Sequence, residues 1–259
     1  MSPDPPLWRE FTYPLNVFMH ILTREAGSVS WLHYGLFDSA DDSLAEAQER
    51  STRLLFSRLP PAPARLLEVG IGLGTTLRRM IDAGYDAVGI TPDEKQVALV
   101  RARDGDAWPV HCVRFEDFRA PGPDPYDVIV FQESSQYIDS EALFARAATL
   151  APRIVVLDEF ALRPIDEEGA LHSWDAFLEA AARHGFTVTE ELDLSERAAP
   201  TMDYFTERIP ASRDRLIADL SLSGQQVDEL ITSGSRYRAR YADGTYGYRL
   251  VCFLRIAAP

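Results

Sequence analysis

The sequence has very little lysine, and its charge balance is strongly acidic. Lys95 is the single lysine among 259 residues, and 26 basic residues stand against 40 aspartates and glutamates. The formal net charge is therefore −14, and the arginines are scattered rather than clustered. Because nucleic-acid binding needs a basic surface that neutralises phosphates, we expect no nucleic-acid partner.

Cysteines and long apolar runs are also scarce. Cys112 and Cys252 are the only cysteines, and each falls in a run typical of a strand. We expect both to be buried and reduced, because their spacing is not that of metal ligands. No stretch approaches the ~18 consecutive apolar residues of a membrane span, and residues 1–10 lack the basic and apolar regions of a signal peptide. We therefore expect a cytoplasmic protein with no metal site and no membrane partner.

Strand and helix patterns alternate through the middle of the chain. Short apolar runs predict seven strands, at residues 64–69, 86–90, 110–113, 126–131, 153–160, 186–192 and 246–256. Amphipathic segments predict helices between them, at residues 75–84, 91–103, 140–150 and 167–185. Thr91 and Glu94 have the pattern of a capping box for the second of these helices. Such alternation predicts an α/β fold, a Rossmann-like, mostly parallel seven-stranded sheet with helices on both faces.

Two segments interrupt this alternation. Residues 1–60 precede the first strand and contain a predicted helix at 41–59, and residues 193–245 are predicted to hold two or three helices. The ligands of open α/β sheets bind at the carboxyl edge of the strands. We therefore predict that the two segments form a helical lid over that edge, while residues 61–192 form the core and residues 246–259 add its last strand. Both segments carry large apolar side chains, among them Trp8, Phe18, Trp31, Met202, Tyr204 and Phe205.

The stretch LLEVGIGLG at residues 66–74 predicts a strand that runs into a ligand-binding turn. Gly70, Gly72 and Gly74 follow the spacing G-x-G-x-G, whereas dinucleotide-binding turns have G-x-G-x-x-G and phosphate-binding loops end in G-K-[ST]. Glu68 would repel a pyrophosphate, but it suits a ligand with an ammonium group. S-adenosylmethionine has such a group on its amino-acid end, together with a carboxylate and a sulfonium cation.

This stretch resembles motif I of the class I S-adenosylmethionine-dependent methyltransferases. Residues 32–55 resemble the H-x-G-x-W/F…A-Q-x-R segment of small-molecule methyltransferases that act on sugars, tocopherols and prenyl-type natural products. QESSQYI at 132–138 is similar to their E-S-x-H-H-M segment, and residues 193–205 are similar to the segment after their sixth strand. GITPDEKQ and RFEDF are similar to G-L-T-L-S-x-x-Q and G-W-E-Q-F of the cyclopropane-fatty-acid and mycolate synthases.

The resemblance implies that residues 61–192 bind S-adenosylmethionine as the cofactor. The glycines would let the backbone approach the cofactor, Glu68 would hold its amino-acid end, and Tyr34 and Gly35 would close over its carboxylate. The full set of cofactor-binding residues that it implies is Tyr34, Gly35, Glu68, Gly70, Gly72, Gly74, Thr91, Gln96, Phe115, Glu116, Asp117 and Gln132.

The ribose and adenine contacts depart in part from the family pattern. Thr91 and Gln96 would meet the ribose, but most of the superfamily has an acidic residue where this chain has Thr91, and Asp93 is the alternative. Phe115 would stack near the adenine, with Glu116 or Asp117 accepting from its amino group. From the residues alone, Thr91 as a helix cap and Phe115 as plain core remain open.

The same resemblance gives the predicted catalytic residues, His33, Glu133, Gln136 and Tyr137. Methyl transfer from a sulfonium is an in-line displacement, so alignment of the reacting atoms supplies much of the rate enhancement. The sugar-type relatives have histidines that can act as a base in E-S-x-H-H-M, and this chain has Gln136 and Tyr137 instead. That departure favours an acceptor that is already nucleophilic, or a base from elsewhere. The candidates for such a base are His33, Glu133, Glu159 and His20.

We therefore predict methylation of a nitrogen, oxygen or carbon atom of a small apolar or aromatic metabolite, in secondary metabolism. One alternative is sulfonium-dependent C-methylation or cyclopropanation of a prenyl or acyl chain. Another is a non-catalytic partner subunit that binds S-adenosylmethionine. The sequence is compatible with a monomer and with a homodimer.

Overall fold

A computed structural model describes residues 7–120, 126–165 and 171–256. They contain a seven-stranded sheet of order β3-β2-β1-β4-β5-β7-β6. The first five strands in this order pair in parallel, and β7 pairs antiparallel with both β5 and β6. The predicted mostly parallel α/β sheet is confirmed. The strands are β1 (Arg65–Val69), β2 (Asp86–Thr91), β3 (Val110–Cys112), β4 (Val128–Gln132), β5 (Arg153–Ala161), β6 (Phe186–Asp193) and β7 (Tyr246–Arg255).

Helices cover both faces of the sheet because successive side chains of a buried strand point to opposite faces. On β4, Val128 and Val130 pack in one apolar cluster, while Ile129 and Phe131 pack in the other. The first cluster includes side chains of α2 (Leu44–Phe56), α3 (Thr75–Asp82) and α4 (Glu94–Asp104). The second includes side chains of α5 (Ser140–Ala147) and α6 (Trp174–Arg183).

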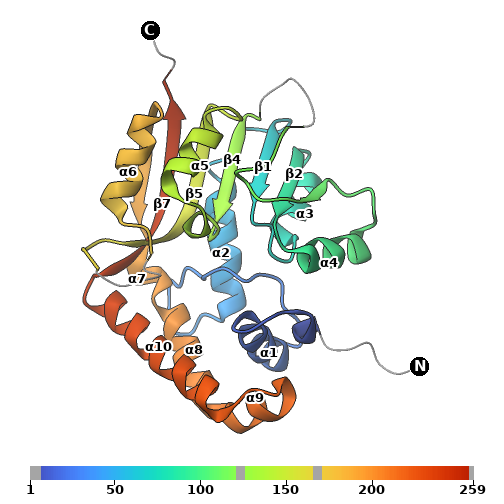
Figure 1. Ribbon diagram of the computed structural model, residues 1–259, viewed down its shortest axis with the longest axis vertical. Helices are drawn as coiled ribbons and strands as arrows, with labels where there is room; N and C mark the ends of the chain where they lie inside the picture. The colour runs from blue at the N-terminus through green and yellow to red at the C-terminus, as the bar shows by residue number, and fades with distance from the viewer. Residues whose placement is uncertain (1–6, 121–125, 166–170, 257–259) are drawn as a thin grey trace.

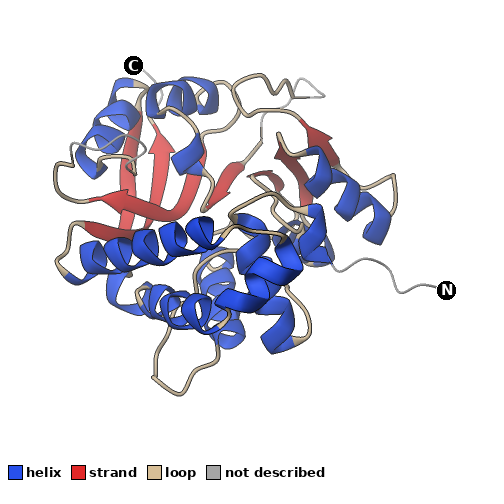
Figure 2. Cartoon of the chain, turned by 60° about the horizontal axis from the view of Figure 1, so that its bottom comes forward, coloured by secondary structure: helices blue, strands red, loops and turns tan. Residues whose placement is uncertain are grey.

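The remaining helices gather beyond the carboxyl ends of the parallel strands (Figures 1 and 2). Their own apolar cluster includes the buried side chains of Val17, Ile209, Leu216 and Val227. They come from the two segments that interrupt the strand–helix alternation, and residues 193–245 hold four helices instead of the two or three predicted. These elements are η1 (Leu7–Glu10), α1 (Leu15–Ala26), α7 (Ser195–Ala198), α8 (Pro200–Ala211), α9 (Arg213–Leu220) and α10 (Gly224–Ala242).

The predicted capping box at the start of α4 is wrong. The helix begins at Glu94, and its N-cap is Asp93, whose carboxylate accepts a hydrogen bond from the backbone N–H of Lys95. Thr91 belongs to β2, which extends one residue farther than predicted. Its hydroxyl donates to the side-chain oxygen of Gln96 in α4 over 2.8 Å and accepts from the backbone N–H of Asp93, so Thr91 links the end of β2 to the start of α4 without being its N-cap.

Two further local predictions need correction. Cys112 is exposed, because β3 lies at the edge of the sheet and only its Val110 is buried; Cys252 is buried as predicted. The helix predicted at 167–185 begins only at Trp174, after the N-cap Ser173, and residues 167–170 lie outside the described residues. Across the described residues, no helix combines the length and apolarity that crossing a bilayer requires.

Candidate active site

The glycine-rich turn after β1 has a backbone that requires glycine. Gly70, Gly72 and Gly74 have φ angles of 79°, 52° and 71°, in the left-handed region that other residues rarely adopt. A Cβ at Gly70 would lie 2.4 Å from the Cβ of Ser134, and one at Gly74 would lie 2.5 Å from Cγ2 of Val100. Around Gly72 the nearest such atom is 3.7 Å away. The outer glycines therefore permit close packing, whereas a Cβ at Gly72 would only make an ordinary van der Waals contact with Leu32.

Buried polar atoms without partners surround this turn. Within the described residues, Glu68 Oε2, Gln132 Nε2 and Trp31 Nε1 are buried and have no hydrogen-bond partner. Burial raises the pKa of Glu68 to about 8. Leaving such groups unpaired costs about 1–3 kcal/mol each. They fit a ligand that supplies an ammonium group to the Glu68 carboxylate and acceptor oxygens to the two N–H groups.

Residues 30–35 run from the glycine-rich turn to the tip of β4. Thr75, at the start of α3, donates its hydroxyl to the carbonyl of Ser30 over 2.5 Å. The backbone N–H of Tyr34 donates to Oε1 of Glu133, also over 2.5 Å. A Cβ on Gly35 would come within 2.5 Å of the α2 side chain Ala47. This segment therefore lies across the carboxyl edge, held by contacts to three different elements.

The predicted ribose contacts lie together at the end of β2. Thr91 is 3% exposed and is hydrogen-bonded to Gln96 in the first turn of α4. The Asp93 carboxylate is occupied in capping that helix. The structure thus brings Thr91 and Gln96 together, as predicted for the ribose contacts, whereas Asp93 serves as the N-cap of α4.

The predicted adenine contacts follow β3. Phe115 is buried and makes an edge contact with Phe131, with ring centroids 5.3 Å apart. Glu116 pairs with Arg114 over 2.7 Å, and this hydrogen bond lowers the pKa of the carboxylate. Asp117 is exposed. Among the described ion pairs, Glu116 is held by Arg114 and Asp117 takes part in none. An adenine amino group would therefore have to compete with an arginine at Glu116 but not at Asp117.

His33 is enclosed by hydrogen bonds. Its Nδ1 lies 2.9 Å from the carbonyl of Tyr34, and its Nε2 lies 3.0 Å from the hydroxyl of Thr52. Burial lowers the pKa of His33 to about 4, so the ring is neutral at pH 7. Both ring nitrogens are used to hold residues 33–34 against α2.

Glu133 has an unusual backbone conformation at the tip of β4. Its φ of 55° makes it one of two described non-glycine residues with a positive φ, a strain of about 1–3 kcal/mol that is typical of functional sites. Its Oε1 accepts from the Tyr34 N–H and, over 2.6 Å, from the Tyr248 hydroxyl. Burial, and then the charge of Glu159, raise its pKa well above the ordinary value.

Gln136 and Tyr137 lie in the short helix η2 (Ser135–Tyr137) that follows Glu133. Tyr137 is 80% exposed. The surrounding protein nevertheless raises its pKa by desolvation, and the carboxylates of Asp158, Glu133 and Glu159 add to the shift. Tyr137 is therefore open to solvent and close enough to these acids to feel their charge.

Tyr237 and Tyr241, which hydrogen-bond to Glu159, are not among the site residues predicted from the sequence. Glu159 of β5 accepts from the hydroxyl of Tyr237 over 3.0 Å and from that of Tyr241 over 2.6 Å. Both tyrosines lie on α10, one turn apart. A signal was present, because residues 237–248 contain four tyrosines, but nothing local indicates that they face β5.

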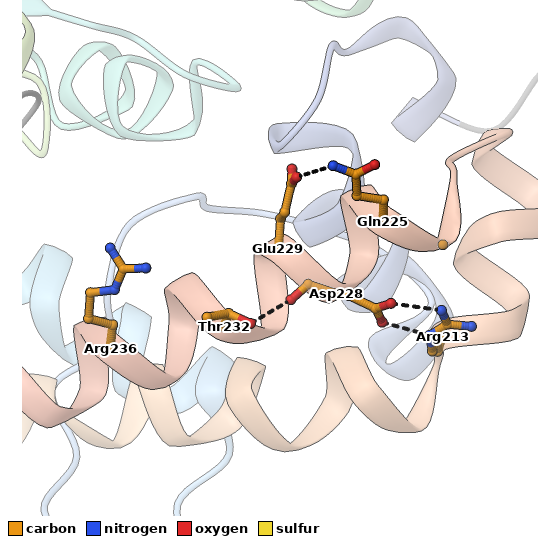
Figure 3. A pocket seen from close by; sticks show the side chains of 7 residues that line it. Arg213, Gln225, Asp228, Glu229, Thr232 and Arg236 are labelled. Carbon is orange, nitrogen blue, oxygen red and sulfur yellow. Dashed lines mark hydrogen bonds and ion pairs between the residues drawn. The ribbon is translucent and has the colours of Figure 1, made fainter.

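A separate depression of about 550 Å³ lies on the outer side of α9 and α10 (Figure 3). Arg213 and Asp228 are paired across it by two hydrogen bonds. No predicted site residue lines it, so it is distinct from the site at the glycine-rich turn.

Comparison with known proteins decides between the ligands that this geometry permits. Residues 43–198, more than half of the chain, match the family described as "Methyltransferase domain". The chain belongs to this methyltransferase family. It is 29% identical over 244 residues to the 27-O-demethylrifamycin SV methyltransferase of Amycolatopsis mediterranei, covering 85% of this chain and 88% of that protein.

One further relative is similar in sequence and one solved structure is similar in fold. The hydroxymycolate synthase MmaA4 of Mycobacterium tuberculosis is 25% identical over 215 residues, covering 70% of this chain and 71% of that one. The crystal structure of the mycolic acid cyclopropane synthase CmaA1 with S-adenosylhomocysteine superposes with a TM-score of 0.75 at 20% identity, covering 96% and 93% of the two chains. The predicted family, fold and cofactor are confirmed.

The protein is an S-adenosylmethionine-dependent methyltransferase, and the residues around its turn fit that cofactor. The unpaired Glu68 oxygen matches the ammonium group of the cofactor, and the unpaired N–H groups match its carboxylate. No cluster of three histidine, cysteine or acidic side chains placed to hold a metal occurs in the described ranges.

Proposed function

We propose that this methyltransferase methylates a small apolar or aromatic metabolite of secondary metabolism, with an aromatic hydroxyl as the preferred acceptor. The observation that carries the proposal is an aromatic wall beside Glu133, made by the half-buried ring of Tyr34 and backed by the fully buried ring of Tyr248. Tyr34 and Tyr248 stack with ring centroids 5.6 Å apart and an interplanar angle of 3°. The Tyr34 hydroxyl also contacts the sulfur of Met202. Such a wall favours a flat, largely apolar acceptor.

The helices beyond the carboxyl edge would form a lid over the acceptor. We propose that residues 1–60 and 193–245 cover the acceptor, while residues 61–192 and 246–259 form the core that binds the cofactor. The apolar cluster between α1, α8, α9 and α10 gives the lid a core of its own. The match to the 27-O-demethylrifamycin SV methyltransferase spans 85% of this chain, more than the core alone, and it therefore includes part of these segments.

Within this proposal, binding and proton-handling roles fall to different residues. Glu68, Gln132 and the glycines would hold the amino-acid end of the cofactor, with Tyr34 and Gly35 closing over it. Thr91 and Gln96 would meet the ribose, and Phe115 with Glu116 or Asp117 would border the adenine. Glu133 is the preferred proton acceptor, because both of its hydrogen bonds use Oε1 and Oε2 is left for the acceptor.

His33 is better suited to positioning than to proton transfer. Its two nitrogens are already hydrogen-bonded, and its lowered pKa of about 4 makes it a weak base. Gln136 and Tyr137 would border the acceptor at the solvent side. The cofactor, when bound, supplies the methyl group as a cation equivalent. His33, Gln136 and Tyr137 would position the acceptor, and Glu133 would take up its proton.

A second candidate function is C-methylation or cyclopropanation of a prenyl or acyl chain. Similarity to the hydroxymycolate synthase favours it. An unsaturated chain would need an extended apolar channel, whereas the aromatic wall beside Glu133 is interrupted by hydroxyls and carboxylates. We therefore rank it second.

The test is formation of S-adenosylhomocysteine by the purified protein, followed by mass spectrometry. Small aromatic hydroxyl compounds are compared with unsaturated acyl and prenyl chains. Turnover with the aromatic compounds supports the proposal, and turnover with the chains alone overturns it in favour of the second function. Tyr34→Ala should raise KM for the aromatic acceptor, while Tyr34→Phe should retain the stacking and the KM.

A further inference from the structure

Two carboxylates lie side by side where α10 meets the sheet. Glu133 follows β4, and Glu159 lies near the end of the neighbouring strand β5. Glu133 accepts hydrogen bonds from the Tyr248 hydroxyl and the Tyr34 N–H, and Glu159 accepts from Tyr237 and Tyr241. Every one of these donors is neutral. The two acids are thus held in place without any compensating positive charge.

The remaining charged groups near the pair are also acidic. None of the described ion pairs includes Glu133 or Glu159, and the buried carboxylate of Asp158 adds a negative charge that acts on both. That carboxylate accepts from the backbone N–H and the hydroxyl of Ser135, over 2.8 and 2.6 Å. Neighbouring buried carboxyl groups cannot all ionise without a large cost in free energy, because their negative charges repel one another. One proton shared by the pair relieves this repulsion.

Burial and neighbouring charges raise both affinities for that proton. Burial and, to a smaller extent, the charge of Asp158 raise the pKa of Glu159 to about 7, against the opposing hydrogen bonds from the hydroxyls of Tyr241, Tyr237 and Tyr34. The pKa of Glu133 is raised well above its ordinary value by burial and by the charge of Glu159. The pair therefore retains a proton at neutral pH.

The pair borders the cofactor site through two covalent connections. Ser134, the residue after Glu133, lies against Gly70 of the glycine-rich turn, and its hydroxyl donates to the carbonyl of Val69 over 2.5 Å. On the other side, Tyr34 lies two residues after Leu32 in the chain, and Leu32 is the side chain nearest to Gly72. A cationic ligand held on this turn places a positive charge next to an acidic pair that lacks one.

We propose that Glu133 and Glu159 form a proton-sharing pair that holds one proton in the free enzyme and releases it to solvent when the sulfonium of S-adenosylmethionine binds. The reaction is a simple exchange, in which the cofactor brings one positive charge and one proton leaves for the buffer. The ionised pair can then accept a proton from an acceptor hydroxyl. The inference depends on cofactor binding and not on the identity of the acceptor.

The product of the reaction provides the matched ligand for a test. S-adenosylhomocysteine carries the same amino-acid, ribose and adenine groups as the cofactor, but it lacks the methyl group and the positive charge on sulfur. Proton release that Glu68 contributes on meeting the ammonium group is common to both ligands. The difference in released protons between the two ligands therefore isolates the effect of the sulfonium.

The experiment is calorimetric titration with each ligand in two buffers of different ionisation enthalpy. It is done at about pH 7.5, just above the pKa of about 7 of Glu159, where the pair holds one proton rather than two. We expect S-adenosylmethionine to release up to about one proton more than S-adenosylhomocysteine. Sinefungin, which carries an amine in place of the methylsulfonium, should behave like S-adenosylmethionine. Equal proton release by the two natural ligands, with both bound, overturns the inference.

Variants assign the proton to the pair. Glu159→Gln and Glu133→Gln should each reduce the difference to less than half, while the exposed control Glu179→Gln should preserve it. A difference that persists in both variants overturns the inference. Should a glutamine variant fail to fold, Tyr241→Phe removes one hydrogen bond that stabilises the ionised Glu159. The pH at which the extra release is half-maximal should then rise, and an unchanged pH would contradict the proposal.

Discussion

The buried carboxyl of Glu68 lowers the stability of the folded protein, and we propose that it also binds the ammonium group of the cofactor. Glu68→Gln should separate these two effects. The pKa of Glu68 is about 8 in the folded protein, against an ordinary value of 4.5, because burial disfavours the charged form. Below about pH 4.5 the residue is protonated in both the folded and the unfolded states. As pH rises toward 8 the unfolded state ionises first, so Glu68 destabilises the fold increasingly across this interval.

The magnitude follows from the size of the shift. One pKa unit corresponds to about 1.4 kcal/mol, so at pH 7 the wild type should lose about 3 kcal/mol relative to a side chain that stays neutral. Glutamine has nearly the same shape and does not ionise. Glu68→Gln should therefore be more stable than the wild type by about 3 kcal/mol at pH 7 and about equally stable near pH 4.5. It should also bind S-adenosylhomocysteine about 10- to 100-fold more weakly, because it loses a hydrogen bond to a charged group.

Urea unfolding of the ligand-free protein between pH 5 and 8 measures the first effect, and calorimetric titration measures the second. The control is Glu179→Gln, which removes an exposed carboxylate of α6 and should leave the pH dependence of stability unchanged. A stability difference between Glu68→Gln and the wild type that stays constant from pH 5 to 8 would refute the reasoning. Unchanged affinity for S-adenosylhomocysteine would show that Glu68 does not hold the ammonium group.

Three other predictions follow from the geometry of the site and of the lid. Gly70→Ala should cost about 1–2 kcal/mol for its left-handed backbone and about 1–3 more for its clash with Ser134, whereas Gly72→Ala should cost only the first part. Adding Ser134→Gly should recover the second part in urea unfolding, and equal losses at the two glycines would contradict this. His33→Ala should lower stability by about 1–3 kcal/mol yet leave the pH profile of methyl transfer unchanged. Loss of the acidic limb, where a general base becomes protonated, would restore His33 as the base. Leu216→Ala, in the fully buried lid cluster, should cost about 2–5 kcal/mol and increase hydrogen exchange in residues 193–245 more than in β1 and β4.

The core of the fold could be predicted because its signals are local. The apolar runs at β1, β4 and β5 are continuous since each strand is buried on both faces, and the spacing of Leu77 and Met80 marks the buried side of α3. The glycine-rich turn was likewise identifiable, because its positive φ angles require glycine at those positions in the sequence. The class of cofactor followed from the resemblance of this short segment to motif I.

Errors arose where a residue's environment depended on an element distant in sequence. Cys112 has a strand pattern like Cys252, but only the order of strands shows that β3 is at the edge and exposed. Thr91 and Asp93 are both acceptable N-caps in sequence, and the choice between them depends on where β2 ends against its neighbours.

The sequence by itself therefore determined the sheet, the turn and the chemistry of the cofactor, since periodicity and glycine spacing act through neighbouring residues. Only the tertiary structure decided which side chains meet over that turn. It joined Tyr237 and Tyr241 of α10 to Glu159 of β5, nearly 80 residues earlier in the chain. It also placed Glu133 against the N-terminal segment through Tyr34. Hydrogen bonds between distant segments depend on how the helices beyond the carboxyl edge pack on the sheet, and no local pattern encodes that packing.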